Sequence, residues 1–313
     1  MKAVRVHRFG GPEVLVYEDL PRPVPASDEV LVRIEAAGVG SWDAWIRSGH
    51  SALPQPLPLT LGSDLAGVVE SVGNSITDLR VGDKVYGVTN SQFTGAYAQW
   101  AVASASMVAR KPKRLSFIEA ASVPVVAVTA WQMLFEHAKM LSGQRILVLG
   151  ASGNVGSMAV QLAYQHGAYT IAAIASDDTV RMRQLGANEV LDLRNGAQVQ
   201  GLGLVDAVID AAGGESQRMA ITKLKPGGVI ISAVSAPDAM QLEAQGAMGS
   251  FILVRTSTEC LQQLAELIDT GKLLTRVGQV LPLHQARMAH EMLDGLRAYA
   301  RGKIVLTTHP DAR

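Results

Sequence analysis

The 313-residue sequence exceeds the usual length of one domain, so we expect two domains, each with its own core. Its 28 lysine and arginine residues balance 28 aspartate and glutamate residues, which argues against nucleic acid or an anionic membrane as a partner. A single cysteine, Cys260, excludes an internal disulfide and a cysteine-rich metal cluster, as is typical of a reducing compartment.

The first eight residues alternate apolar and charged side chains, as a half-buried strand does, and lack the apolar core of a signal peptide. No later apolar run has the length and continuity of a membrane-spanning helix. We therefore expect a cytoplasmic protein with no membrane partner.

Two kinds of sequence follow one another along the chain. Up to about Arg114 the sequence is strand-like and interrupted by glycine and proline, with apolar runs at 30–34 and 66–72, which predicts a compact β-rich domain. From Ser116 helical periodicity alternates with short apolar strands, which is typical of a parallel sheet covered on both faces. These strands are expected at 145–149, 170–174, 206–209 and 229–231.

Helices and a closing strand complete the expected elements. A helix is predicted over 155–166, closed by Gly167, and two more over 261–270 and 284–297. The last strand is expected at 303–307. Because an isolated strand is not stable, we expect it to rejoin the sheet of the first domain.

A glycine-rich loop at 150–156 lies between the strand at 145–149 and the helix that follows. Its glycines fall where backbone must approach a pyrophosphate, and amides at the helix start would face that anion. The spacing is G-x-x-G-x-x-G, with Asn154, a residue that tolerates unusual dihedrals, where a further glycine is common. The pattern predicts a dinucleotide site, and the alternative is a tight packing turn without a ligand.

The end of the second strand bears on the choice of cofactor. NAD recognition uses an acid there, but the strand ends at Ala175 and Ser176, which leaves room for the 2′-phosphate of NADPH. Ser176 is a hydrogen-bond donor, and Arg181 or Arg194 is a candidate counter-charge. We therefore expect NADPH rather than NADH.

Asp177 and Asp178 oppose that interpretation, because either carboxylate would repel a phosphate if it turned inward. The alternative is that this pair forms the cap and first turn of the next helix, where negative charge is favourable.

Nine ordered segments of the chain share a pattern with a known family. They are 38–43, 61–69, 81–87, 95–100, 128–131, 150–156, 208–214, 224–228 and 302–306. Together they resemble the medium-chain dehydrogenase/reductase superfamily, and within it the zinc-independent quinone oxidoreductase branch. The resemblance implies a GroES-like β-rich catalytic domain and a doubly wound Rossmann domain, with the cofactor in the cleft between them, and commonly a homodimer. The implied boundaries are 1–118 and 253–313 for the catalytic domain and 119–252 for the dinucleotide-binding domain.

The residues at the implied zinc positions are not ligands. Zinc-dependent relatives carry cysteine where Gly40 stands and a His-Glu pair where Ser63 and Asp64 stand. Since zinc needs several cysteine, histidine or carboxylate ligands that converge, and the seven histidines are scattered, we expect no metal site.

The resemblance also implies which residues contact the cofactor. Thr129 corresponds to a hydroxyl near the nicotinamide ribose, and Lys303 to a basic residue that reaches the cofactor. Alternatively, Thr129 bonds its own helix and Lys303 is a solvated lysine. The full expected set is Thr129, Ser152, Gly153, Asn154, Val155, Ala175, Ser176, Arg181, Ala211, Val234, Ser235 and Lys303.

The implied substrate pocket lacks polar groups that many quinone reductases have. Those enzymes carry an asparagine at the position of Gly40 and tyrosines at the positions of Trp45 and Ser51. What remains is an aromatic wall with one hydroxyl, although either tryptophan could instead belong to the core. Asp43 and Asp64 are expected to bond backbone at turns rather than act as acids. The predicted substrate-binding residues are Ser41, Trp42, Trp45, Phe93 and Phe251.

These features predict an NADPH-dependent oxidoreductase that passes hydride to a small electron-poor quinone or α,β-unsaturated carbonyl compound. Two alternatives stay open. One is a zinc-free carbonyl or alcohol oxidoreductase, which would lack the usual Lewis acid. The other is a catalytically weak dinucleotide-binding protein that acts as a redox sensor or interaction partner.

Overall fold

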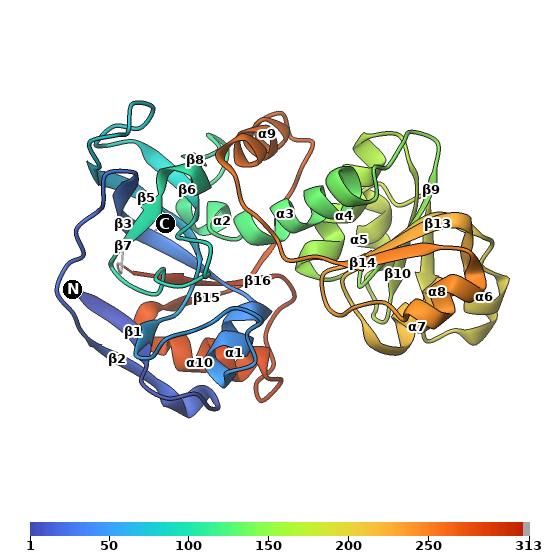
Figure 1. Ribbon diagram of the computed structural model, residues 1–313, viewed down its shortest axis with the longest axis horizontal. Coiled ribbons are helices and arrows are strands. Elements are labelled where there is room, and N and C mark those ends of the chain that lie inside the picture. The colour runs from blue at the N-terminus through green and yellow to red at the C-terminus, as the bar shows by residue number, and fades with distance from the viewer. Residues whose placement is uncertain (309–313) are drawn as a thin grey trace. The chain divides into compact units, whose positions relative to one another are not determined.

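The computed structural model describes residues 1–308, which fold into two compact units (Figure 1). Unit 1 comprises Met1–Val125, Thr256–Gly271 and residues 275–308, and unit 2 comprises Val126–Arg255 with Lys272–Leu274. Unit 2 is therefore inserted in the sequence of unit 1. Within residues 1–308, no helix combines the length and the apolar character that crossing a membrane requires.

Unit 1 is built on two sheets of mostly antiparallel strands. Its strands are β1 (Lys2–Val6), β2 (Leu15–Asp19), β3 (Glu29–Val39), β4 (Leu59–Thr60), β5 (Asp64–Val72), β6 (Lys84–Val88), β7 (Trp100–Ser104), β8 (Val108–Arg110), β15 (Val277–Pro282) and β16 (Lys303–Thr307). The larger sheet has the order β15-β16-β3-β5-β6-β8, with β7 also paired to β3, and the smaller has the order β2-β1-β4. The β-rich domain expected from the first third of the sequence is confirmed.

The helices of unit 1 differ in part from those expected. They are α1 (Ser41–Ser48), α2 (Phe117–Ala120), α9 (Thr258–Asp269) and α10 (Ala286–Leu293), with the 3₁₀ turns η1 (Pro12–Val14), η2 (Ala105–Met107) and η4 (Leu283–Gln285). The prediction of a helix over 284–297 is wrong at its end, because Gly295 turns the chain with a φ of +75°. In α9 the Ser257 hydroxyl caps the Cys260 amide at 3.2 Å, so the helix starts before residue 261.

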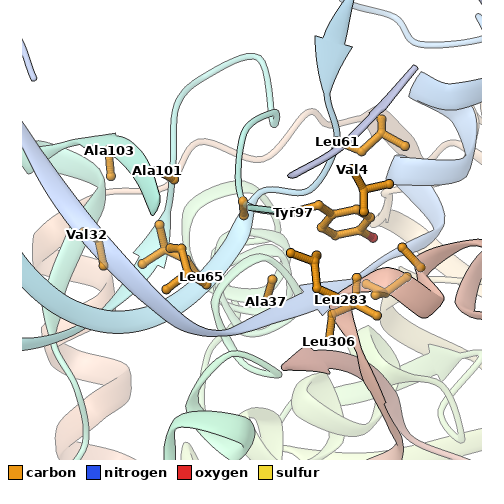
Figure 2. Close-up of a cluster of buried hydrophobic side chains, with 14 of the residues drawn as sticks. Val4, Val32, Ala37, Leu61, Leu65, Tyr97, Ala101, Ala103, Leu283 and Leu306 are labelled. Atoms are coloured by element: carbon orange, nitrogen blue, oxygen red, sulfur yellow. The ribbon is translucent and has the colours of Figure 1, made fainter. Parts of the chain in front are cut away.

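The core of unit 1 unites residues from both ends of the chain. Figure 2 shows Val4, Leu61 and Tyr97 in one buried cluster with Leu283 and Leu306. Leu306 lies on β16, which pairs antiparallel with β3, so the expected return of the closing strand to the first sheet is confirmed. This pairing also brings the start of β16 beside the end of β3, next to α1.

Unit 2 is a six-stranded parallel sheet with helices between its strands. The strands are β9 (Arg145–Leu149), β10 (Tyr169–Ile174), β11 (Glu189–Asp192), β12 (Val205–Asp210), β13 (Leu224–Ser232) and β14 (Met248–Phe251). The helices are α3 (Pro124–Trp131), which begins at the unit boundary, the π-helical η3 (Gln132–His137), α4 (Asn154–Gln165), α5 (Thr179–Gln184), α6 (Gly196–Gly201), α7 (Gly214–Ile221) and α8 (Ala239–Gln245). The strand order is β11-β10-β9-β12-β13-β14.

That order is the doubly wound order 3-2-1-4-5-6 of dinucleotide-binding sheets, so the predicted fold of this unit is confirmed. All the strands are parallel, but the order in which successive strands are added reverses between β9 and β12. Ligands of such sheets bind beyond the carboxyl ends of the strands at this point. The predicted strand at 145–149 matches β9, whereas β13 starts at Leu224, earlier than the predicted strand at 229–231.

Candidate active site

The loop after β9 uses its three glycines in three different ways. Gly150 has a φ of +68°, a left-handed conformation that glycine adopts without strain. A Cβ on Gly156 would lie 2.2 Å from the Gly150 carbonyl oxygen, so this glycine permits close packing of α4 on the loop. Gly153 is the exposed N-cap of α4, and its backbone amide bonds the Gly150 carbonyl at 2.9 Å.

The predicted pyrophosphate cradle lies at the N-terminus of this twelve-residue helix. Ser152, Asn154 and Val155 are half-buried around the exposed Gly153. Free amides and the helix dipole make such a terminus attractive to a phosphate. Asn154 is the first helical residue of α4, and the left-handed conformation in this loop belongs to Gly150, so the position of Asn154 does not require a glycine.

The end of β10 faces this loop through a pair of hydroxyls. Ser176 donates a hydrogen bond to the Ser152 Oγ at 3.1 Å, and the neighbouring Ala175 is exposed. The structure therefore brings the predicted pyrophosphate loop next to the strand end at which the 2′-phosphate of NADPH was expected.

The charged residues beyond β10 are arranged differently from expectation. Asp178 is the N-cap residue of α5, but its side chain makes no capping bond, and Asp177 lies before the helix rather than in its first turn. Asp177 is 93% exposed and accepts a hydrogen bond from Arg194 at 2.8 Å. Arg181 lies 3.9 Å from the Asp178 carboxylate. Both predicted counter-charges thus already interact with carboxylates.

A buried aspartate that the sequence analysis did not assign organises the next two loops. Asp210, at the end of β12, accepts hydrogen bonds from the Ala212 and Gly213 amides at 3.0 and 2.8 Å. Its second oxygen accepts from Gln217 and Ser232 at 2.8 and 2.7 Å. The signal in the sequence was an acid that ends an otherwise apolar strand.

This network places three predicted cofactor residues. Ala211 directly follows Asp210, and its amide bonds the Leu149 carbonyl of β9 at 3.2 Å. The side-chain amide of Gln217 donates to the Ser235 carbonyl at 3.0 Å, and the backbone amide of Val234 donates to the Ser232 hydroxyl at 3.2 Å. The loops after β9, β12 and β13 therefore lie at one edge of the sheet. Thr129 lies in α3 and is buried.

The predicted substrate residues of unit 1 centre on Trp42 in α1. Its indole N–H donates to the Ser63 Oγ at 2.9 Å, and the Lys303 ammonium lies 4.1 Å from its ring centroid. Lys303 is 1% exposed and its Nζ lies 3.0 Å from Oδ2 of the fully buried Asp64. The alternative of a solvated lysine is wrong.

Asp43 fixes the start of α1. Its Oδ2 accepts hydrogen bonds from the Gly40 amide at 2.8 Å and from the Tyr97 hydroxyl at 3.0 Å. Burial raises the pKa of Asp43 to about 7, although these bonds and the Lys303 charge oppose the rise. The predicted backbone bonds are confirmed for Asp43, and also for Asp64, which accepts from the Val125 amide at 2.9 Å. The ion pair of Asp64 was not foreseen.

The other predicted substrate residues differ in their surroundings. Ser41 is exposed at the first position of α1, and Trp45 is 44% exposed, so Trp45 does not belong to the core. Phe93 and Trp42 are half-buried against the core of unit 1. Phe251 ends β14 in unit 2 and is 39% exposed. Unit 1 therefore contains four of the five predicted wall residues.

A second buried polar group lies on the other side of Tyr97. Arg47 bonds His290 Nδ1 at 2.9 Å and the Asp294 carboxylate at 2.7 Å, and the His290 ring contacts Tyr97 edge-on. Burial and the Arg47 charge lower the pKa of His290 to about 3. His290 is therefore neutral at physiological pH and accepts the bond from Arg47.

Unit 1 also contains a surface cavity of about 520 Å³. Its lining includes Asp28, Asp78, Arg110 and Glu259, and none of the predicted site residues. In the described part of the chain, no three histidine, cysteine, aspartate or glutamate side chains are grouped as metal ligands would be.

Comparison with known proteins gives the family. The family described as "Alcohol dehydrogenase GroES-like domain" matches residues 26–113, and the one described as "Zinc-binding dehydrogenase" matches residues 185–306. The mouse quinone oxidoreductase is 32% identical over 311 residues, covering 93% of each chain. These matches identify unit 1 as GroES-like, as expected.

Solved structures resemble the whole chain. A structure described as an NAD-dependent alcohol dehydrogenase is 32% identical, with a TM-score of 0.87, and covers 99% of this chain and 100% of its own. The Escherichia coli quinone oxidoreductase in complex with NADPH is 26% identical, with a TM-score of 0.87, and covers 98% of this chain and 100% of its own. The chain therefore belongs to the medium-chain dehydrogenase/reductase superfamily, in its quinone oxidoreductase-like branch.

Proposed function

We propose that this protein is a zinc-independent oxidoreductase that binds NADPH and transfers hydride to a quinone or an α,β-unsaturated carbonyl compound. The observation that carries the proposal is the loop at the switch point of the unit 2 sheet. There, bare backbone at Gly150 and Gly153 leads into the N-terminus of α4, beside the hydroxyls of Ser152 and Ser176. This arrangement fits a pyrophosphate and the ribose next to it.

The preference for NADPH is supported by the exposed Ala175 and by the half-buried hydroxyl of Ser176 at the end of β10. Arg181 and Arg194 lie near Asp178 and Asp177, just beyond the end of β10, so each would have to share its charge between a 2′-phosphate and a carboxylate. The NADPH complex of the Escherichia coli relative is consistent with this preference.

The bound nicotinamide would supply the hydride, so the protein needs no side-chain nucleophile. We propose that Trp42 and Trp45 hold a flat electron-poor ring and that the Ser41 hydroxyl donates to its carbonyl oxygen. Hydride brings two electrons and one proton to the acceptor, and a second proton from water completes a hydroquinone. Ser41 is exposed, which suits exchange of that proton with solvent.

A panel of quinones, enones and simple carbonyls, assayed with NADPH and with NADH, tests the function. We expect turnover of quinones or enones with NADPH, undiminished by chelator, and less than one zinc per chain by elemental analysis. A stoichiometric metal, or activity that is lost in chelator, would contradict zinc independence.

A zinc-free alcohol or carbonyl oxidoreductase is the second candidate, because the chain also resembles an NAD-dependent alcohol dehydrogenase. Oxidation of alcohols with NAD in the same panel would favour it. Tight NADPH binding without turnover of any acceptor would instead favour a redox sensor.

A further inference from the structure

The indole of Trp42 is held in one position by three neighbours in unit 1. Its N–H bonds Ser63, the Lys303 ammonium lies 4.1 Å from its ring centroid, and its ring rests on the bare backbone of Gly40. A Cβ on Gly40 would lie 2.3 Å from the ring carbon Cη2 of Trp42. A ring with a directional hydrogen bond on its edge and a cation on its face has little rotational freedom.

Lys303 is itself anchored. The side chain is 1% exposed, and its Nζ lies 3.0 Å from Oδ2 of Asp64, which is also fully buried. The other Asp64 oxygen accepts from the Val125 amide at 2.9 Å. Withdrawing Lys303 would leave a buried carboxylate without its counter-charge, which is strongly unfavourable. The ammonium is therefore a fixed part of the surroundings of Trp42.

We propose that Lys303 is a positioning residue for the acceptor, which acts by holding the Trp42 indole, rather than a ligand of the cofactor. This inference rests on the proposed function of Trp42 as a wall for a flat acceptor ring. Ser63 and Gly40 act together with Lys303. Ser63 accepts the hydrogen bond from the indole N–H, and Gly40 leaves the space that the ring occupies because it has no side chain.

The proposed role of Lys303 predicts an effect on KM for the acceptor and no effect on the affinity for NADPH. If Lys303 positions Trp42, then Lys303→Met should raise KM for an acceptor such as 1,4-naphthoquinone about tenfold or more and leave NADPH affinity unchanged. Lys303→Arg, which keeps the cation, should restore part of the loss. Lys111→Met is the control, because Lys111 is a half-buried lysine of unit 1 whose ammonium also lies near an aromatic ring, 5.5 Å from the centroid of Phe117.

Gly40→Ala tests the same device without touching a charge. Gly40 has a φ of −123°, so alanine introduces no backbone strain, and its effect comes from the methyl group against the indole. We expect a rise in acceptor KM similar to that of Lys303→Met. Combining Gly40→Ala with Trp42→Leu should cost no more than Trp42→Leu alone, because the smaller side chain leaves room for the methyl group.

A readout that needs no turnover keeps this inference separate from the proposed function. The sequence has four tryptophans, so replacing Trp45, Trp100 and Trp131 by phenylalanine leaves Trp42 as the reporter. Lys303→Met should shift the Trp42 emission and lower its anisotropy, whereas Lys111→Met should do neither. If the parent reduces no quinone, the proposed function fails and the emission still decides the role of Lys303.

Two results would overturn the inference. One is a tenfold loss of NADPH affinity in Lys303→Met with acceptor KM unchanged, which would make Lys303 a cofactor residue. The other is unchanged Trp42 emission. If Lys303→Met does not fold, the double variant Lys303→Met with Asp64→Asn replaces it. This variant removes both buried charges and keeps a side-chain oxygen that accepts the Val125 N–H. The same two results, measured on the double variant, would overturn the inference.

Discussion

Asp64 in unit 1 and Asp210 in unit 2 are both fully buried, but they are stabilised by different means. Asp210 accepts four hydrogen bonds from neutral groups, all within 22 residues of it in sequence. Asp64 accepts one backbone bond and otherwise faces the ammonium of Lys303, from the far end of the sequence. In unit 2, neutral donors that are near in sequence stabilise the loops around Asp210. In unit 1, the charge of Lys303, which is distant in sequence, stabilises Asp64 and the surroundings of Trp42.

The largest expected effect comes from neutralising the two aspartates in turn. Asp64→Asn leaves the buried Lys303 charge uncompensated and should lower the free energy of unfolding by about 3–5 kcal/mol. Asp210→Asn weakens a network of neutral donors and should cost about 1–3 kcal/mol. Urea denaturation of the two variants at neutral pH measures both.

Adding Lys303→Met to Asp64→Asn should recover part of the loss, because no unpaired charge then remains. If Asp64→Asn and Asp210→Asn lowered the free energy of unfolding equally, the two aspartates would not be stabilised by different means.

Next in size is the pH dependence that buried ionisable groups give to unit 1. The pKa of Asp43 is about 7 in the fold against an ordinary 3.8, so the folded state keeps a proton that the unfolded chain has lost. This contribution is complete below pH 4 and is lost as the pH rises toward 7, at about 1.4 kcal/mol per unit. His290 has the opposite effect: its pKa is lowered from 6.5 to about 3, so its contribution grows from pH 3 to 6.5.

The two slopes offset each other in the native protein between pH 4 and 6.5. Asp43→Asn should therefore leave a stability that rises with pH in this window, and His290→Gln one that falls. Urea denaturation at pH 4, 5, 6 and 7 gives the slopes. Parallel curves for the two variants and the native protein would show that neither group titrates as inferred.

The third effect concerns the bare backbone of unit 2. The Cβ of Gly153→Asp would meet its nearest atom, the Gly150 carbonyl oxygen, at 3.1 Å, and Gly153 has an ordinary φ of −78°, so the fold should persist. A carboxylate at the pyrophosphate should weaken NADPH binding about a hundredfold or more, which corresponds to about 2.8 kcal/mol. Titration calorimetry measures the affinity, and Gly153→Ser is the uncharged control. Unchanged affinity would exclude this loop from the cofactor site.

The smallest effect concerns the choice between cofactors. Ala175→Asp places an acid at the exposed end of β10, where it should bond ribose hydroxyls and repel a 2′-phosphate. We expect the ratio of kcat/KM for NADPH and NADH to change about ten- to a hundredfold, or about 1.4–2.8 kcal/mol. A native preference for NADH would mean that Asp177 leaves Arg194 to reach the ribose.

The sequence predicted unit 2 better than the wall of unit 1. The strand at 145–149 is signalled by a continuous apolar run, and the helix after it by the glycine-rich turn before it and by Gly167 at its end. All these signals lie within one short segment. The network around Asp210 is equally local, but an acid at a strand end does not reveal which donors it will meet. Asp177 and Asp178 were assigned from helix-capping preference, and the Arg194 side chain prevailed over it for Asp177.

In unit 1 the surroundings of Trp42 depend on tertiary pairing. Lys303 reaches Asp64 and Trp42 because β16 pairs with β3, and no pattern near residue 303 signals a buried lysine. The α1 helix was also missed, because its eight residues are too few for a clear periodicity. Its start depends on Asp43, whose partner Tyr97 lies far along the sequence.

The position of β16 determines when the large sheet of unit 1 can be completed during synthesis. β16 lies inside the large sheet of unit 1, between β15 and β3, although it is synthesised after the other strands of residues 1–308. The contiguous segment Val126–Arg255 can assemble its parallel sheet earlier, while β3 still has an open edge toward the missing strand. During that interval the exposed edge can template pairing with another nascent chain. The newly made protein should therefore depend on chaperones most strongly just before β16 emerges from the ribosome.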